Sequence, residues 1–145
     1  MPEIIFRKLT PHDYKSMVRV WQKAGLPYRP QGRESSAAIM RQLGDDHIKA
    51  LGAFSDGEMV GVVIGSHDGR KGWINRLAVV PEMQKQGIAQ ELVSKVEQIF
   101  ESTGIKMYAA LINSDNLASM SLFQKLGYEV KPHIMYFRKL ADKEF

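Results

Sequence analysis

The sequence contains no cysteine among its 145 residues. This absence excludes disulfide bonds, thiolate metal sites and a cysteine nucleophile, so any thiol chemistry has to come from a cofactor. Apolar runs of about 18 residues, which a membrane-spanning helix requires, are also missing, and the sequence begins without a long apolar signal segment. These absences predict a cytoplasmic protein that does not associate with a membrane.

The sequence also lacks clustered basic charge. The net charge is +4, but lysines and arginines never occur more than two in a row and are spread from Arg7 to Lys143. Nucleic-acid binding needs a basic stripe, often with interleaved aromatic residues, so we expect no nucleic-acid partner. Diffuse positive charge is compatible with a small polyanionic ligand.

Metal sites and catalytic triads find little support. The four histidines include no pair spaced four apart, so a zinc site is not expected. Ser66, His67 and Asp68 are consecutive, whereas a triad is assembled in space from residues that are usually distant in sequence.

The composition that remains is that of a globular protein, with 44% hydrophobic and 25% charged residues. A chain of this length buries roughly two thirds of its unfolded surface on folding, which is enough for a core without disulfides or metals. We expect residues 1–145 to form a single domain.

Apolar periodicity and turn residues predict an α/β fold. Strands are expected at residues 3–9, 48–54, 59–65, 73–80, 107–112 and 134–140, and helices at residues 10–24, 37–43, 87–100 and 116–126. The second and third strands should form an antiparallel hairpin around Asp56-Gly57, and the fourth and fifth should be joined by a helical crossover. The expected architecture is a mixed, mostly antiparallel central sheet with flanking helices.

The most informative stretch runs from the fourth strand into the following helix. The strand ends at Pro81, and the helix begins near Gly87 and Ala89, whose small side chains let a phosphate approach the backbone. The first N–H groups of a helix lack internal partners and form a positive end suited to anions. A plain strand, turn and helix explains the same residues equally well, but the glycine patterns of dinucleotide-binding and P-loop proteins are absent.

Two spaced motifs resemble the GNAT superfamily of N-acetyltransferases. The first is Gln84-Lys85-Gln86-Gly87-Ile88-Ala89, which matches the family's arginine or glutamine, two variable residues, glycine, one more residue, then glycine or alanine. The second keeps the family's spacing of an asparagine, a small residue, an aromatic residue and a glycine-aromatic pair. Its members here are Asn116, Ser119, Phe123, Gly127 and Tyr128.

The resemblance implies a GNAT-like fold that binds acetyl-coenzyme A (acetyl-CoA) and transfers its acetyl group to an amine within a ternary complex. It also implies that the backbone of Leu77, Ala78 and Val79 pairs with the pantetheine arm. Backbone amides of residues 84–89 would hold the pyrophosphate, and Asn116 would bind the cofactor near the thioester, with Ser119 and Phe123 in the same motif.

The catalytic residues stay unassigned at this point. Phe123 stands where the family usually has a tyrosine that protonates the departing thiolate, and phenylalanine has no proton to donate. The strand at residues 73–80 carries no carboxylate to serve as a base. Glu82 lies just beyond it, where an acid also complements the helix dipole, and Asn75 is placed to orient a water.

The acceptor is expected to meet the loop at residues 25–36. Tyr28, Arg29 and Arg33 are candidates to contact an amine acceptor that carries an anionic group, although solvated loop charges explain them as well. The favoured function is acetylation of a primary amine on a small molecule or peptide. The alternative is a non-catalytic acyl-CoA sensor or interaction module, and the oligomeric state is open, a homodimer included.

Overall fold

The computed structural model describes residues 3–145. The strands are β1 (Ile4–Lys8), β2 (Ile48–Ser55), β3 (Glu58–His67), β4 (Gly72–Val79) and β5 (Tyr108–Ala109). The α-helices are α1 (Tyr14–Lys23), α2 (Ser36–Leu43), α3 (Ile88–Ser102) and α4 (Leu117–Lys125), and two short 3-10 helices are η1 (Pro11–Asp13) and η2 (Pro81–Met83).

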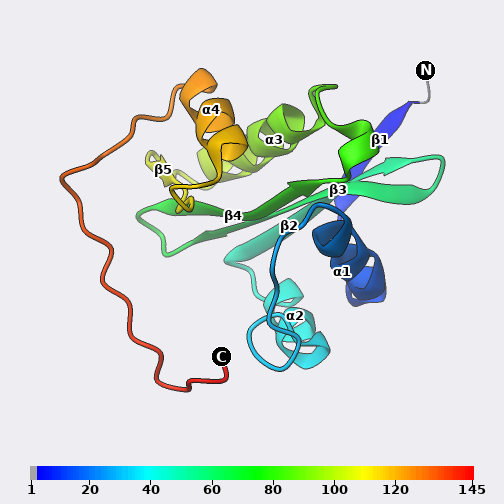
Figure 1. Ribbon diagram of the computed structural model, residues 1–145, viewed down its shortest axis with the longest axis horizontal. Helices are drawn as coiled ribbons and strands as arrows, with labels where there is room; N and C mark the ends of the chain where they lie inside the picture. The colour runs from blue at the N-terminus through cyan, green and yellow to red at the C-terminus, as the bar shows by residue number, and fades with distance from the viewer. Residues whose placement is uncertain (1–2) are drawn as a thin grey trace.

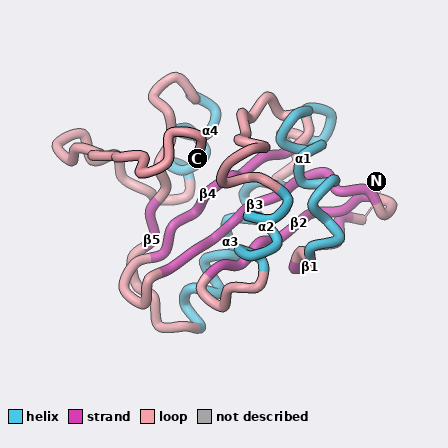
Figure 2. The backbone as a smooth tube through the Cα atoms, turned by 90° about the horizontal axis from the view of Figure 1, so that it is seen from below, coloured by secondary structure: helices cyan, strands magenta, loops and turns pink. Residues whose placement is uncertain are grey.

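The five strands form one sheet in the order β1-β2-β3-β4-β5. The first three neighbouring pairs are antiparallel and the β4–β5 pair is parallel, with α3 as the crossover. Helices α1 and α2 lie on one face of the sheet, and α3 and α4 lie on the other (Figure 1, Figure 2). The predicted mixed, mostly antiparallel sheet with flanking helices is confirmed.

The core lies between the sheet and its helices. Helix α3 buries Ile88, Leu92, Val96 and Phe100, which is the apolar face its sequence periodicity predicts. Phe100 packs so closely on Gly72 that a Cβ at that position would lie 2.5 Å from its ring. This glycine therefore lets α3 approach the start of β4.

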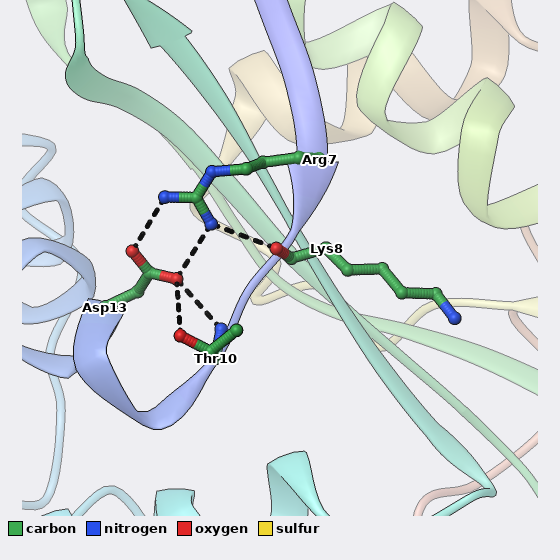
Figure 3. Close-up of polar contacts among 4 residues, drawn as sticks. All are labelled: Arg7, Lys8, Thr10 and Asp13. Carbon is green, nitrogen blue, oxygen red and sulfur yellow. Dashed lines mark hydrogen bonds and ion pairs between the residues drawn. The ribbon is translucent and has the colours of Figure 1, made fainter.

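The entry into α1 is held by an ion pair. Arg7 donates from Nη1 and Nη2 to the two carboxylate oxygens of Asp13 at 2.9 and 3.0 Å, and the Thr10 N–H donates to Asp13 Oδ2 at 2.8 Å (Figure 3). Asp13 is only 9% exposed, and these hydrogen bonds, the Arg7 bond first, lower the pKa of its carboxyl group. The carboxylate thereby joins β1 to the helix that follows it.

We expect Asp13→Asn to lower the free energy of unfolding by about 1 to 2 kcal/mol at pH 7, because Arg7 loses a charged partner but is itself half exposed. A carboxyl group whose pKa is lowered by folding stabilises the protein at pH values above its ordinary pKa. This stabilisation is lost as the pH falls through the folded-state pKa. The difference between wild type and variant should therefore shrink below pH 3.8, the ordinary value. Urea unfolding at several pH values measures it, with exposed Asp46→Asn as the control; a difference independent of pH would contradict the assignment.

Two predicted strands differ from the structure. The fifth is shorter than expected, since only Tyr108 and Ala109 of residues 107–112 pair with β4. The prediction of a last strand at residues 134–140 is wrong in this structure, where residues 126–145 contain no helix or strand. They run away from the sheet after α4 and return toward the loop before α2 (Figure 1), so their β-prone side chains have no neighbouring strand.

Among the described residues 3–145, no helix is both long enough and apolar enough to cross a membrane.

Candidate cofactor and acceptor site

Strand β4 has an open edge beside β5. The two strands pair only at Gly72 with Tyr108 and at Trp73 with Ala109, so in the described structure residues 74–79 have no strand partner on that side. The predicted site residues Leu77, Ala78 and Val79 lie in this open stretch. An extended ligand with amide groups can hydrogen-bond to such an edge as an added strand would.

The loop after β4 folds back on the strand. Gln84 donates from Nε2 to the carbonyl oxygen of Val79 at 2.9 Å, a side-chain role that the motif alone did not reveal. Lys85 and Gly87 both have positive φ, at 65° and 82°. Left-handed residues within a turn direct neighbouring backbone N–H groups into a concave, anion-binding arrangement.

The N-terminus of α3 has free backbone donors. Gly87 is its N-cap and no side chain caps it, whereas Ser35 and Asn116 accept hydrogen bonds at the starts of α2 and α4. The first intrahelical bond runs from the Glu91 N–H to the Gly87 carbonyl, 3.0 Å away. The N–H groups of residues 88–90 therefore lack helical acceptors, at the positive end of a helix of 15 residues. The predicted residues Gln84, Lys85, Gln86, Gly87, Ile88 and Ala89 all belong to this loop and helix start.

The second motif forms the start and buried face of α4. Asn116 Oδ1 accepts the Ser119 N–H at 3.1 Å, so these two predicted residues close the helix N-terminus. Phe123 is 5% exposed, and its ring lies edge-on to Tyr128 with centroids 5.0 Å apart. Phe123 thus packs into the core cluster rather than facing solvent.

Tyr128 is the phenol in contact with Phe123. Its hydroxyl donates to Glu97 Oε2 at 2.6 Å. Burial, followed by the bond to Glu97, raises the pKa of Tyr128 far above its ordinary value. A phenol held in this way is a poor proton donor at neutral pH, which disfavours Tyr128 as a replacement for the tyrosine missing at Phe123.

Glu82 is an exposed partner of Lys23 on α1. Lys23 Nζ lies 2.7 Å from Glu82 Oε1, and this hydrogen bond is the main reason that the pKa of Glu82 is lowered. A carboxylate with a lowered pKa is a weaker base, which disfavours Glu82 as the general base.

The side chains of the three predicted acceptor residues make different contacts. Tyr28 packs against Trp21 with ring centroids 6.0 Å apart, and Arg29 donates from Nη2 to the Lys143 carbonyl at 3.3 Å. Arg33 alone of the three lines a cavity of about 260 Å³ between α2 and the strands β2, β3 and β4. That cavity also includes Glu34, Ser66, Asn75, Arg76 and Phe145.

Sequence reasoning missed two charged residues of this cavity, Glu34 and Arg76. The signal for Arg76 was available, because it is the one charge in a run at residues 73–80 that is otherwise apolar apart from Asn75. Glu34 gave no such signal within a polar loop.

The consecutive His67 and Asp68 stabilise the β3–β4 turn. His67 Nδ1 accepts the Gly69 N–H, and Asp68 Oδ1 accepts the N–H groups of Arg70 and Lys71.

Solved structures share this arrangement of elements. The aminoglycoside N-acetyltransferase AAC(6′)-Iy, solved with a bisubstrate analogue of coenzyme A, aligns with a TM-score of 0.80 at 18% identity, covering 96% of this chain and 99% of that one. The PaiA N-acetyltransferase of Thermoplasma acidophilum, solved with coenzyme A, aligns with a TM-score of 0.78 at 23% identity, covering 89% and 91%. At these identities the likeness concerns the fold.

Sequence comparison identifies the family. An acetyltransferase of Pectobacterium atrosepticum is 31% identical over 142 residues, which is 97% of each chain, and one of Sodalis glossinidius is 30% identical over 92% of this chain and 94% of its own. The model of the acetyltransferase (GNAT) family matches residues 14–128, which include both motifs. The chain therefore belongs to the GNAT family of acetyltransferases.

Proposed function

We propose that this protein transfers an acetyl group from acetyl-CoA to a primary amine of a small molecule or peptide. The observation that carries the proposal is the open edge of β4, followed after the short helix η2 and one loop by an uncapped helix N-terminus, in a chain of the GNAT family. The amide groups of a pantetheine arm can hydrogen-bond to the open edge of β4, and the negative charge of a pyrophosphate suits the N-terminus of α3. The neighbouring structures solved with coenzyme A support this choice of donor.

The cofactor residues follow from this placement. The backbone of Leu77, Ala78 and Val79 would hold the pantetheine arm. The amides of residues 84–89 would hold the pyrophosphate, with Gln84 fixing the loop to β4 through its bond to Val79. Asn116, Ser119 and Phe123 would border the thioester end.

The chemistry needs no covalent enzyme intermediate. The neutral amine attacks the thioester carbon, a C–N bond forms, the C–S bond breaks, and the electron pair of that bond leaves with the thiolate. One amine proton passes to solvent and the thiolate takes up a proton from solvent. Direct transfer agrees with a chain that has no cysteine.

We expect acetyl-CoA to raise the melting temperature, because a ligand that binds only the folded state stabilises it by about 2.7 kcal/mol at a hundredfold excess over its dissociation constant. Differential scanning fluorimetry with acetyl-CoA, coenzyme A and ATP measures this. Melting curves that move with none of the three would remove the cofactor assignment. A shift with ATP alone would replace it.

The second candidate function is an acyl-CoA sensor or interaction module without turnover. Phe123 provides no acid, and the Tyr128 hydroxyl beside it is already donated to Glu97. A panel of polyamines, amino acids, aminoglycosides and peptide N-termini, read by a thiol-detecting dye, separates the two functions. Release of coenzyme A above hydrolysis background with any amine supports the transferase, and background rates with all of them favour the sensor.

We also propose a homodimer formed through residues 130–140, here called the C-terminal arm. Ile134, Met135, Tyr136 and Phe137 are 63%, 74%, 65% and 89% exposed, an unusual run of apolar surface. The arm is β-prone, and β5 is the short strand at one edge of the five-stranded sheet. In a dimer, the arm of each copy would pair as a strand with the β5 edge of the other copy, so that the backbone groups of both edges and both arms are hydrogen-bonded.

Light scattering after size exclusion should give about twice the chain mass of 16.4 kDa. Ile134→Ser with Phe137→Ser should give a monomer that keeps its acetyl-CoA response, and exposed Leu117→Ser on α4 serves as the control. If wild type is a monomer and its backbone amides at residues 134–140 resist hydrogen exchange, the arm pairs with the sheet of its own chain and the dimer proposal is wrong.

A further inference from the structure

Arg76 occupies a strained position in the middle of β4. Its φ is +56°, a left-handed conformation that a residue with a long side chain seldom adopts. The pairing of β3 with β4 shifts register at this point, from Val62 with Ala78 to Ile64 with Asn75, so β4 contains one extra residue. Such strain persists where the surrounding structure fixes it, and it is concentrated at functional sites.

The guanidinium of Arg76 is held on one side and free on the other. It lies over the Trp21 ring, with Cζ 4.5 Å from the ring centroid, and Nη1 donates to the Pro27 carbonyl at 2.7 Å. Nε and Nη2 are buried, and among the described residues they have no hydrogen-bond partner. A buried donor without an acceptor costs free energy, and an acceptor that paired with these two N–H groups would remove that cost.

Among residues 3–145, which the structure describes, no carboxylate forms an ion pair with Arg76. Glu34 is the buried carboxylate of the cavity, and it is already engaged, because Oε1 accepts the Arg29 N–H at 2.8 Å and Oε2 lies 3.4 Å from Arg33 Nε. Glu34 thus accepts one backbone N–H and pairs with one guanidinium, that of Arg33. Burial is the main cause that lowers the pKa of Arg76, and the charge of nearby Glu34 opposes it only in part.

We propose that the Nε and Nη2 edge of Arg76 binds a carboxylate of the acceptor, so that the acceptor is an amine that also carries a carboxylate group. The proposal rests on the proposed function and names the substrate class of the same site. Side by side, Nε–H and Nη2–H form the two-pronged donor that matches the two oxygens of a carboxylate.

The position of the cavity agrees with this assignment. Asn75 and Arg76 line it and directly precede the open stretch of β4 that begins the proposed pantetheine edge at Leu77. A carboxylate anchored at Arg76 therefore keeps the amine of a short acceptor close to the donor. The volume of about 260 Å³ suits a ligand of amino-acid size rather than an aminoglycoside.

The test compares each amino acid of the panel with its own carboxamide, a pair that differs only in the charged group. We expect wild type to prefer the acid by about a hundredfold in kcat/KM, since buried polar groups left unpaired by an analogue discriminate strongly. Arg76→Met keeps an apolar stem over Trp21 and should bring the acid-to-amide ratio close to one. Arg76→Lys, which keeps charge but loses the two-pronged edge, should fall between them. Exposed Arg41→Met on α2 makes the same change in net charge and should keep the wild-type ratio.

Calorimetric titration of the amino acid into protein loaded with coenzyme A provides a readout without turnover. The carboxylate site is supported if wild type binds the amino acid, Arg76→Met does not, and acetyl-CoA still raises the melting temperature of the variant. If these results are obtained but no amine is acetylated, only the proposal of acetyl transfer fails. Dipeptides with a free carboxylate, tested in the same way, distinguish peptide ends from free amino acids. Equal rates for acid and amide in wild type, or a ratio unchanged in both Arg76 variants, would overturn the proposal.

Discussion

Gly87→Val should weaken acetyl-CoA binding by about a hundredfold or more, which corresponds to about 2.7 kcal/mol. Gly87 has a φ of +82°, a conformation that a β-branched residue strongly disfavours. A Cβ at this position meets no atom within 4 Å beyond the two neighbouring residues, so the Cβ itself has room in the unliganded protein. The loss of affinity would come from a turn that no longer directs its N–H groups, together with methyl groups in the path of the pyrophosphate.

The control for this variant is Gly69→Val. Gly69 lies in the β3–β4 turn with a φ of +84° and an equally open surrounding, so it carries the same backbone strain at the other end of β4. Both variants should lose about 1 to 3 kcal/mol of stability, and only Gly87→Val should lose affinity in calorimetric titration. Gly87→Asn should recover part of the binding, because asparagine tolerates this conformation better. Equal affinities in Gly87→Val and Gly69→Val would exclude the loop as the pyrophosphate site.

Phe123→Tyr should keep the turnover rate or raise it, by up to about a hundredfold where protonation of the thiolate limits the reaction. The substitution restores the tyrosine expected of the family at a residue that is 5% exposed. A buried hydroxyl without a partner costs about 1 to 3 kcal/mol of stability, which thermal unfolding in the absence of ligand measures. Initial rates of coenzyme A release with the best amine of the panel measure the catalytic effect.

Tyr128→Phe is the matched variant for Phe123→Tyr. It removes the neighbouring phenol, whose hydroxyl donates to Glu97 and whose pKa is raised. We expect it to lose stability but to keep the wild-type rate. A large fall in its rate would make Tyr128 the acid. A fall by orders of magnitude in Phe123→Tyr at unchanged cofactor affinity would show that the phenylalanine itself shapes the transition state.

Local sequence signals predicted most of the fold. The Asp56-Gly57 turn has the two positive φ angles that its residues predict, and α3 buries the stripe that its periodicity predicts. The family resemblance drawn from two motifs is confirmed by the family model over residues 14–128. These features depend on neighbours within a turn or a helix, where residue type and spacing determine the conformation directly.

Other features depended on partners distant in the chain. Residues 134–140 have the side chains of a strand, but a strand also needs a neighbour, and the sheet of the same chain does not provide one. Phe123 marked a departure from the family in sequence, but only the packing showed that the neighbouring Tyr128 hydroxyl is already bonded to Glu97.

The order of most elements, the family and the position of the loop at residues 84–89 could be predicted from the sequence, because each rests on local periodicity or on a contiguous motif. Only the folded structure shows that Arg33, Glu34 and Arg76 line one cavity. Those residues come from a loop and a strand more than 40 positions apart, and no local pattern encodes their meeting. The position of the Arg76 guanidinium depends on its contacts with Trp21 and Pro27 and on the bulge in β4. Its burial and its lack of an acceptor at Nε and Nη2 result from these long-range contacts, so the sequence could not predict them.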